Sequence, residues 1–393
     1  MVELNSKYKE DLMFMITKYE ENFIAPYYCF SKQELVEYIN EYLSKVTIKN
    51  DYEFIYFLKS IIKKLNGTLD CHTTVREKHQ FIPIMLKMFE DDIYVVRTNK
   101  ENDDLLYSKL ESINGVSYQD LIKEMESIIS FGTEGWRKSC IEDGLCELNS
   151  LLSLPSINSE GKKVNLVFST QNGEGRTLEF KDGDETEELN PHKENCSFEV
   201  IDNTIHYIYN SCSREDSEKL ISTIEQMKKY ISEGTIKDFI LDLRDNSGGS
   251  SAVIKPLIEF LSSQELNLYT FVNRNTFSSG MFALEDMIKL GATTIGEGVG
   301  STLNGFGNLD GIFELPNTKF SLRIATKYFP KDGGAITSQD DYKEQVTRGD
   351  LEPVFYIPDI VVTEKIQDYI EGRDIYIEKF MKIKDKNKEE YEK

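Results

Sequence analysis

Short apolar segments alternate with amphipathic segments along the C-terminal half of the chain, and this alternation constrains the fold more than any other feature. From about residue 199 onward, strand-like segments are separated by segments with helical spacing; the former lie at 206–210, 236–244, 267–273 and 292–297, the latter at 217–234, 250–263 and 278–291. Apolar strands that alternate with helices are typical of a parallel sheet covered on both faces. We therefore predict an α/β domain over residues 199–393.

The N-terminal part has a different pattern. Apolar residues recur at three- and four-residue spacing in the stretches 9–23, 31–46 and 51–67, which predicts three helices. Ser31 followed by Glu34 predicts a capping box at the start of the second helix. We assign residues 1–75 to an N-terminal helical region.

The intervening residues 76–198 contain signals for short antiparallel strands. A strand-like stretch at 91–99 is followed by a strand, an Asn-Gly turn and an amphipathic helix over 105–129. The stretch 162–180 is predicted to be a hairpin, with Asn172-Gly173 near its turn. We interpret 76–198 as a small mixed α/β region.

Length and charge limit the classes of function. A chain of 393 residues is long enough for two or three domains. Its net charge of −22 at pH 7 disfavours binding to nucleic acid or to an anionic membrane surface, because phosphate groups carry charge of the same sign. The sequence contains no apolar run of about 18 residues, which a membrane-spanning helix needs. The charged N-terminus does not resemble a secretory signal, so we expect a cytoplasmic protein.

Cysteine and histidine spacing argues against a metal centre. The six cysteines are scattered and form no CxxC pair, and no histidine pair has the spacing of a zinc-binding helix. We therefore expect reduced, structural thiols and neither a metal nor another cofactor. The oligomeric state is not fixed by the sequence.

Two polar turns follow neighbouring strands of the predicted sheet. The first, "LDLRDNSGG", ends in Gly248-Gly249, where backbone N–H groups can approach a ligand closely, although a simple strand-to-helix turn also explains it. The second, "NTFSSG", places Ser278 and Ser279 at a helix start. Either serine could cap that helix, or one could be a nucleophile whose developing oxyanion is bound by the next amide.

A serine nucleophile needs a base, and the chain has four histidines: His72, His79, His192 and His206. His72 lies in the turn "LDCHTTV", before a β-prone segment. His206 is expected to be a strand residue, while His79 and His192 lie in polar stretches. A lone histidine is more often a surface or hydrogen-bonded structural residue than a catalyst, so His72 stands as one candidate.

Three segments in this order resemble the C-terminal-processing (tail-specific) serine peptidase family, in particular its lysine-lacking, tricorn-like branch: "LDCHTTV", "LDLRDNSGG" and "NTFSSGMFALEDMIKLGATTIGE". The stretch 107–125 also resembles part of the family's PDZ-like region, and "FYIPDIVV" its closing Pro-Asp strand. The resemblance implies a ClpP/crotonase-like catalytic core with a parallel sheet, preceded by a helical region and a small PDZ-like region.

The resemblance also implies roles for individual residues. Ser278 matches the serine of the family's Thr-x-Ser motif, but Met281 stands where the family has glutamate, so Ser279 is kept as an alternative nucleophile. The amide after the nucleophile, from Ser279 or Gly280, would form half of the oxyanion hole. An amide of Gly248 or Gly249 would form the other half.

The base implied by the resemblance is a histidine. Many family members use a lysine in a Gly-Lys-Gly motif, where this chain reads "GEGVGSTLNGFGN". The tricorn-like branch uses a histidine of the earlier turn, which corresponds to His72, with Cys71 in place of the preceding serine. A late glutamate of that branch is matched best by Glu352.

The expected function is hydrolysis of peptide bonds in protein or peptide substrates by a serine endopeptidase. The missing lysine and Met281 leave open a catalytically degenerate relative that binds peptides or ligands. A crotonase-like acyl-CoA enzyme ranks last, because the acidic chain offers no evident basic patch for the CoA phosphates.

Overall fold

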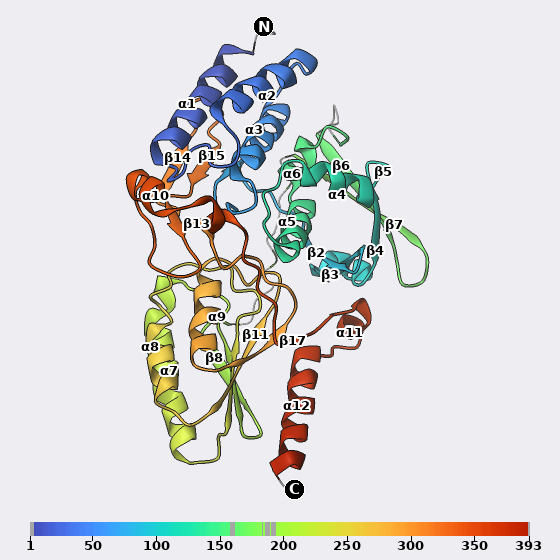
Figure 1. The fold of residues 1–393 in the computed structure, drawn as a ribbon. Helices are drawn as coiled ribbons and strands as arrows, with labels where there is room; N and C mark the ends of the chain where they lie inside the picture. Colours follow the sequence, from blue (N-terminus) through green and yellow to red (C-terminus); the bar gives the residue numbers. More distant parts are fainter. Residues whose placement is uncertain (1–3, 158–161, 183, 185–188, 190–193, 392–393) are drawn as a thin grey trace. The chain divides into compact units, whose positions relative to one another are not determined.

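The predicted alternation of strands and helices forms one six-stranded sheet in a computed structural model, which describes residues 4–157, 162–182, 184, 189 and 194–391 (Figure 1). The order of the strands across the sheet is β17-β12-β11-β10-β9-β8. Their bounds are β8 (Ser197–Ile201), β9 (Thr204–Ile208), β10 (Asp238–Asp242), β11 (Asn267–Val272), β12 (Thr293–Gly296) and β17 (Ile360–Val361). All neighbours pair in parallel except β8, which is antiparallel to β9. The predicted α/β class is confirmed.

Helices cover both faces of this sheet, as the apolar strands require. On one face, Tyr376 and Phe380 of α12 share a core with Ile240, Phe271 and Ile295 of the strands. On the other side of the sheet in Figure 1 lie helices that follow β9, β10 and β11. The helices of this part of the chain are η2 (Arg214–Asp216), α7 (Ser217–Ser232), α8 (Lys255–Ser262), α9 (Ser279–Lys289), α11 (Ile366–Ile370) and α12 (Ile375–Tyr391).

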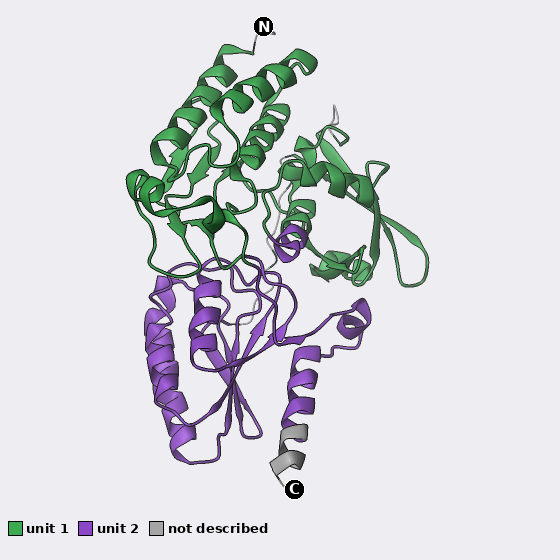
Figure 2. Ribbon diagram, in the orientation of Figure 1, with its two compact units in different colours: residues 1–132, 140–189, 302–354 green, residues 133–139, 190–301, 355–393 purple. Residues whose placement is uncertain are grey.

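The chain divides into two compact units (Figure 2). Unit 2 contains the six-stranded sheet and consists of Thr133–Ser139, Asn190–Ser301 and Phe355–Lys393. Unit 1 consists of Met1–Gly132, Cys140–Leu189 and Thr302–Val354. Sequence order groups the segment Thr302–Val354 with the C-terminal α/β domain, whereas its contacts place it in the unit of the N-terminal helices.

The three predicted N-terminal helices are present in unit 1 as α1 (Ser6–Asn22), α2 (Lys32–Lys45) and α3 (Asp51–Asn66). The capping box of α2 is also confirmed, with Ser31 and Glu34 each bonded to the other's backbone amide. The buried residues Phe54 and Leu58 share one core with Phe306 and Leu322. This core explains the placement of Thr302–Val354, because its short strands carry apolar side chains that α1 and α3 cover.

The elements of Thr302–Val354 are short. Two of its strands, β14 (Gly311–Glu314) and β15 (Ser321–Ile324), form an antiparallel sheet with β1 (Thr74–Arg76) from the N-terminal part of the chain. The strand β13 (Gly305–Gly307) pairs with β16 (Lys327–Phe329). The segment also contains α10 (Gln339–Gln345) and η3 (Arg348–Leu351).

A second core of unit 1 lies under an antiparallel sheet of order β2-β3-β4-β6-β7, with β5 paired to β4. The strands are β2 (Ile84–Phe89), β3 (Asp92–Thr98), β4 (Lys109–Ile113), β5 (Val116–Ser117), β6 (Lys163–Ser169) and β7 (Gly175–Lys181). The predicted hairpin is β6-β7, and the predicted Asn-Gly turn joins β4 to β5. The helices near this sheet in sequence are η1 (Lys100–Leu105), α4 (Tyr118–Glu126), α5 (Glu134–Cys146) and α6 (Leu148–Ser153).

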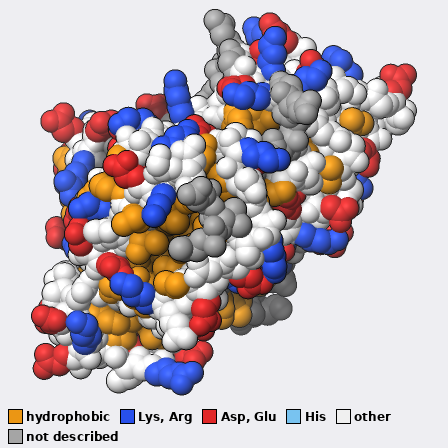
Figure 3. Space-filling model, turned by 90° about the horizontal axis from the view of Figure 1, so that it is seen from above, with side chains coloured by type: hydrophobic (Ala, Val, Ile, Leu, Met, Phe, Trp, Pro, Cys, Tyr) orange, Lys and Arg blue, Asp and Glu red, His pale blue; other side chains and the backbone are white. Residues whose placement is uncertain are grey.

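Charged side chains of both signs cover the face seen in Figure 3, with hydrophobic side chains between them. The net charge of −22 is therefore not spread as a uniform acidic surface on that face. Within the described residues, no helix combines the length and the apolar character needed to cross a bilayer. The same residues contain no cluster of three or more His, Cys, Asp or Glu side chains suited to a metal ion.

Candidate active site

The two serines of the "NTFSSG" turn have different environments in unit 2. Ser278 occupies the N-cap position of α9, directly after the loop that follows β11, but makes no side-chain cap hydrogen bond. Its backbone has φ 53° and ψ −122°. A non-glycine residue in such a conformation stores about 1–3 kcal/mol of strain, which persists only where the surroundings impose it. This strained strand-to-helix turn is the geometry of a nucleophile elbow.

Ser279 is instead bound within the turn. It is 6% exposed, and its hydroxyl donates to the carbonyl of Gly249 at 2.8 Å. As the first residue of α9, it has a backbone N–H without an intrahelical acceptor, as helix geometry requires. The hydroxyl of Ser279 is thus hydrogen-bonded within the turn, and its amide is suited to bind an anion.

The glycine turn after β10 packs directly against Ser278. A Cβ added to Gly248, whose φ is 100°, would lie 2.7 Å from the Ser278 Cβ, so only glycine fits there. The Gly248 amide donates to Oδ1 of the buried Asn246 at 3.0 Å. Gly249 forms a bridge with Cys212 in which the hydrogen bonds are made by the Gly248 carbonyl and the Ser250 amide. The amide of Gly249 therefore makes neither of the two hydrogen bonds of that bridge.

Gly280 is less suited to a role in the oxyanion hole. Its amide donates to the carbonyl of Phe277 at 2.9 Å, which closes the first turn of the helix. A Cβ at this position would lie 2.7 Å from the Asn246 carbonyl oxygen, so glycine permits the close approach of α9 to the loop after β10. Of the four candidate amides, those of Ser279 and Gly249 fit oxyanion donors best.

Backbone and side-chain hydrogen bonds join the two turns. Thr276 donates from Oγ1 to the carbonyl of Leu243 at 2.9 Å, and the Phe277 amide donates to the carbonyl of Asn246 at 2.9 Å. Asp245 accepts hydrogen bonds from the side-chain amides of Asn273 and Asn275, each at 2.9 Å. The predicted oxyanion turn and the predicted nucleophile turn thus form one rigid assembly.

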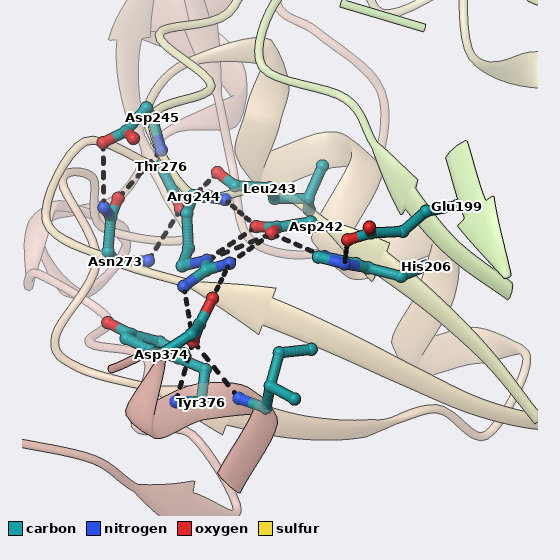
Figure 4. A network of polar contacts seen from close by, with 11 residues as sticks. Glu199, His206, Asp242, Leu243, Arg244, Asp245, Asn273, Thr276, Asp374 and Tyr376 are labelled. Atoms are coloured by element: carbon teal, nitrogen blue, oxygen red, sulfur yellow. Dashed lines mark hydrogen bonds and ion pairs between the residues drawn. The ribbon is translucent and has the colours of Figure 1, made fainter. Parts of the chain in front are cut away.

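A buried ionic network lies at the end of β10 (Figure 4). The Asp242 carboxylate contacts His206 Nε2 at 2.9 Å and Arg244 Nη2 at 2.6 Å. Arg244 also binds Asp374, which accepts hydrogen bonds from the first amides of α12. Burial favours a neutral carboxyl, but the charge of Arg244 and the hydrogen bonds to Asp242 outweigh it and hold the pKa of Asp242 well below its usual range.

His206 is a residue of β9, as predicted, and is 1% exposed. Its second ring nitrogen contacts Glu199 at 3.0 Å, so both nitrogens are used within the network. The sequence did not reveal that Asp242 and Arg244 belong to this network, because their partners come from β9 and from the start of α12.

His72 lies in unit 1, in a turn that its neighbours define closely. The buried Asp70 accepts hydrogen bonds from the amides of His72 and Thr73, at 2.8 and 2.9 Å. Asn66 donates to the Thr73 carbonyl at 2.8 Å, and Thr73 Oγ1 accepts from the Ala325 amide at 3.0 Å. The imidazole lies beside β13, where a Cβ on Gly307 would be 3.6 Å from His72 Cε1.

The electrostatics of His72 favour the neutral imidazole. Loss of hydration around the half-buried ring lowers the pKa of His72 to about 4, against a hydrogen bond to the Phe306 carbonyl that acts in the opposite direction. A neutral imidazole has one N–H, and when that group donates to a carbonyl the other nitrogen has the acceptor form. The neighbouring Cys71 is a protonated thiol, because burial raises its pKa to about 12.

Glu352 also belongs to unit 1. Its side chain is exposed, and its backbone carbonyl accepts a hydrogen bond from Asn304 Nδ2 at 2.9 Å. Asn304 directly precedes β13, the strand beside His72. The main chain of Glu352 is therefore bonded to the residue that precedes β13, the strand beside His72.

Of the other histidines, His79 also belongs to unit 1. His79 contacts Glu147 and helps to line a polar cavity of about 650 Å³ in unit 1, which is bordered by α3 and the β14–β15 connection and to which neither His72 nor Glu352 contributes. His192 lies outside the described residues.

Comparison with known proteins identifies the fold. No protein-family model matches the sequence, and no curated protein matches it. Among solved structures, mature CPAF complexed with lactacystin is similar, with a TM-score of 0.65 and 11% identity over 97% of this chain and 98% of that chain. Mature CPAF alone gives a TM-score of 0.63 and 11% identity over 93% and 94% of the two chains. A serine-to-alanine variant of CPAF gives a TM-score of 0.59 and 10% identity over 92% of this chain and 94% of that chain. The chain therefore has the fold of CPAF.

Proposed function

We propose that this chain is a serine endopeptidase that hydrolyses peptide bonds of protein or peptide substrates, with Ser278 as the nucleophile and His72 as the base. The observation that carries the proposal is the backbone of Ser278, which has φ 53° at a turn between a strand and a helix. Strain of this kind collects at catalytic turns, where it directs the hydroxyl toward the substrate. Ser279 does not share this conformation, and its hydroxyl is committed to Gly249.

In the proposed reaction, His72 accepts the proton of Ser278 Oγ while that oxygen bonds to the carbonyl carbon of the substrate. The resulting oxyanion accepts hydrogen bonds from the amides of Ser279 and Gly249, each worth about 3 kcal/mol of barrier. The imidazolium then returns the proton to the leaving amine as the peptide bond breaks. Water releases the acyl group by the same steps, and Glu352 is the proposed partner that stabilises the charged imidazolium.

Two further observations support this assignment. The motifs around His72, Gly248 and Ser278 resemble those of C-terminal-processing peptidases in the same order along the chain. The fold is that of CPAF, one structure of which contains lactacystin. Lactacystin is accordingly a reasonable first compound to test as a competitor for the proposed site.

The test is cleavage of unfolded casein by the purified protein and by two variants. The wild-type chain and Ser279→Ala are expected to cleave casein, whereas Ser278→Ala is expected to have no activity above background. Circular dichroism should establish that all three proteins are folded. Cleavage by Ser278→Ala with loss in Ser279→Ala would move the nucleophile by one residue.

The same experiment separates the enzyme from a catalytically degenerate, ligand-binding relative. The absence of the family lysine and the presence of Met281 are the features that would fit such a relative. In that case the wild type and Ser278→Ala would both fail to cleave casein, and neither would react with a fluorophosphonate.

A further inference from the structure

The strained backbone of Ser278 needs support from the residues around it. Hydrogen bonds fix the inner side of the turn through Thr276 and Phe277, which bind the loop after β10. The Ser278 amide itself donates to Ser301 Oγ at a long distance of 3.3 Å. The side chain of Phe277, which is 6% exposed, gives further support.

The ring of Phe277 stacks on Trp136. The two ring centroids are 3.9 Å apart and the planes are inclined by only 6°. Trp136 is the single tryptophan of the chain and belongs to Thr133–Ser139, the short segment of unit 2 that contains the first turns of α5. A large flat side chain therefore covers the residue immediately before the proposed nucleophile.

The segment that carries Trp136 is itself held closely against the loop after β12. Thr133 Oγ1 donates to the Val299 carbonyl at 2.8 Å and accepts from the Trp136 amide at 3.1 Å. A Cβ on Gly135 would lie 2.5 Å from the Gly298 carbonyl oxygen, and one on Gly300 would lie 3.2 Å from Trp136 Cε3. The Gly300 amide in turn donates to the Thr276 carbonyl at 2.9 Å.

These contacts form a closed path from Thr133 through Trp136 and Phe277 to Thr276, and back through Gly300. We infer that Trp136 is a positioning residue for the reaction, which fixes the backbone of Ser278 in its strained conformation through the ring of Phe277; the inference rests on the proposed function. Trp136 does not take part in bond formation. It acts by restricting the Ser278 hydroxyl to the orientation from which it attacks.

The consequence is a specific loss of reactivity when the ring is removed. Trp136→Leu should lower the maximal rate of fluorophosphonate labelling of Ser278 about tenfold, the scale of one well-stacked aromatic pair. The concentration of probe at half-maximal rate should stay unchanged, because Trp136 is not proposed to contact the probe. Trp136→Phe keeps a ring over Phe277 and should restore the labelling rate to within about twofold of wild type.

A double-mutant cycle tests whether Trp136 acts through Phe277. Phe277→Leu should cause a loss similar to that of Trp136→Leu, and the double variant should lose little more than either one. If Trp136→Leu does not fold, Phe277→Leu removes the same stack and takes its place in the comparison. Tyr230→Leu is the matched control, since it removes an aromatic contact of unit 2, that with Phe198, on other elements.

The outcomes separate this inference from the proposed function. A wild-type chain that is not labelled at Ser278 overturns the proposed function. Labelling of the wild type together with equal maximal rates in folded Trp136→Leu, or in folded Phe277→Leu, overturns the positioning role alone. Losses in the two variants that add fully in the double variant also contradict it, because independent effects would not require the stack.

Discussion

At the scale of single residues, the environment of each titratable group determines its chemistry. His72 and His206 have the same side chain, but His206 contacts carboxylates through both ring nitrogens. The half-buried His72 instead lies beside Gly307 of β13 and the carbonyl of Phe306. Among the histidines that the structure describes, His72 is the one in a turn that resembles a catalytic motif.

The pH dependence of the reaction follows from the lowered pKa of His72. The base must be neutral, so the labelling rate of Ser278 should fall only as the pH drops through the pKa of His72 in the folded protein, which is about 4. An ordinary histidine would titrate near 6.5. Rates measured between pH 4 and 8 should stay nearly constant down to about pH 5. A midpoint at 6.5 or above would contradict the proposed environment of His72.

Arg244 should be important for stability. Arg244→Met removes the cation that pairs with the buried Asp242 carboxylate, and breaking a buried pair of this kind costs about 3 kcal/mol or more. Because the folded-state pKa of Asp242 is depressed, the carboxylate contributes stability at pH values above its unfolded pKa of about 3.9, and the contribution is lost as the pH falls through the folded-state value. The loss in Arg244→Met should therefore appear in urea denaturation at pH 7.

A surface pair in the same unit provides the comparison for Arg244. Lys228 contacts Glu225 on α7, and both side chains are about half exposed or more. Lys228→Met should change the free energy of unfolding by less than about 0.5 kcal/mol. Equal effects of the two substitutions would show that the Arg244 network does not stabilise unit 2.

At the scale of elements, hydrogen bonds and close packing join the glycine turn after β10 to the serine turn before α9. Gly248→Ala would force a Cβ to within 2.7 Å of the Ser278 Cβ at a φ of 100°. We expect this variant to fold but to react with a fluorophosphonate at least about 100-fold more slowly, because the oxyanion turn must move away from the nucleophile.

Gly234→Ala provides the matched control for the glycine turn. Gly234 also has a positive φ, 75°, and belongs to the same unit, but a Cβ there would meet nothing within 4 Å. The substitution should cost about 1 kcal/mol of stability and leave the labelling rate unchanged. A similar loss of reactivity in both variants would mean that backbone strain alone, and not the approach to Ser278, is responsible.

The elements themselves could largely be predicted from the sequence. The periodicity of 9–67 and the alternation after residue 199 gave the right types of element, because burial of one face or of a whole strand leaves a clear apolar pattern. The strands β13 to β16 were not predicted, since segments of three or four residues carry too little pattern. Trp136 was also missed, because a single aromatic residue in a polar stretch does not reveal which ring it contacts.

At the scale of the whole molecule, contacts between distant parts of the chain could not be predicted. Asp11 of α1 is fully buried and accepts hydrogen bonds from the backbone amides of Asn317 and Thr318, both at 2.8 Å. These residues lie in the connection between β14 and β15. These hydrogen bonds depend on the placement of Thr302–Val354 in unit 1. No local sequence pattern predicts that placement.

The hydrogen bonds of Asp11 provide a test of that placement. Asp11→Ala should lower the free energy of unfolding by about 1–3 kcal/mol, because the part-buried donors of Asn317 and Thr318 lose the buried carboxylate that accepts from them. Glu21→Ala on the same helix removes an exposed pair with Lys18 and should change it by less than about 0.5 kcal/mol. Denaturant unfolding of the two variants measures both values, and equal stabilities would contradict the packing of α1 against the β14–β15 connection.

The central claim is that Ser278 attacks with His72 as its base, and its most direct test is the mapped rate of fluorophosphonate labelling. The adduct should be found by mass spectrometry on the peptide that contains Ser278, and on Ser278 itself when that peptide is fragmented. In His72→Gln, which should fold, the rate of its formation should fall at least about 100-fold. An adduct on Ser279, no adduct at all, or an unchanged rate in His72→Gln would contradict the account.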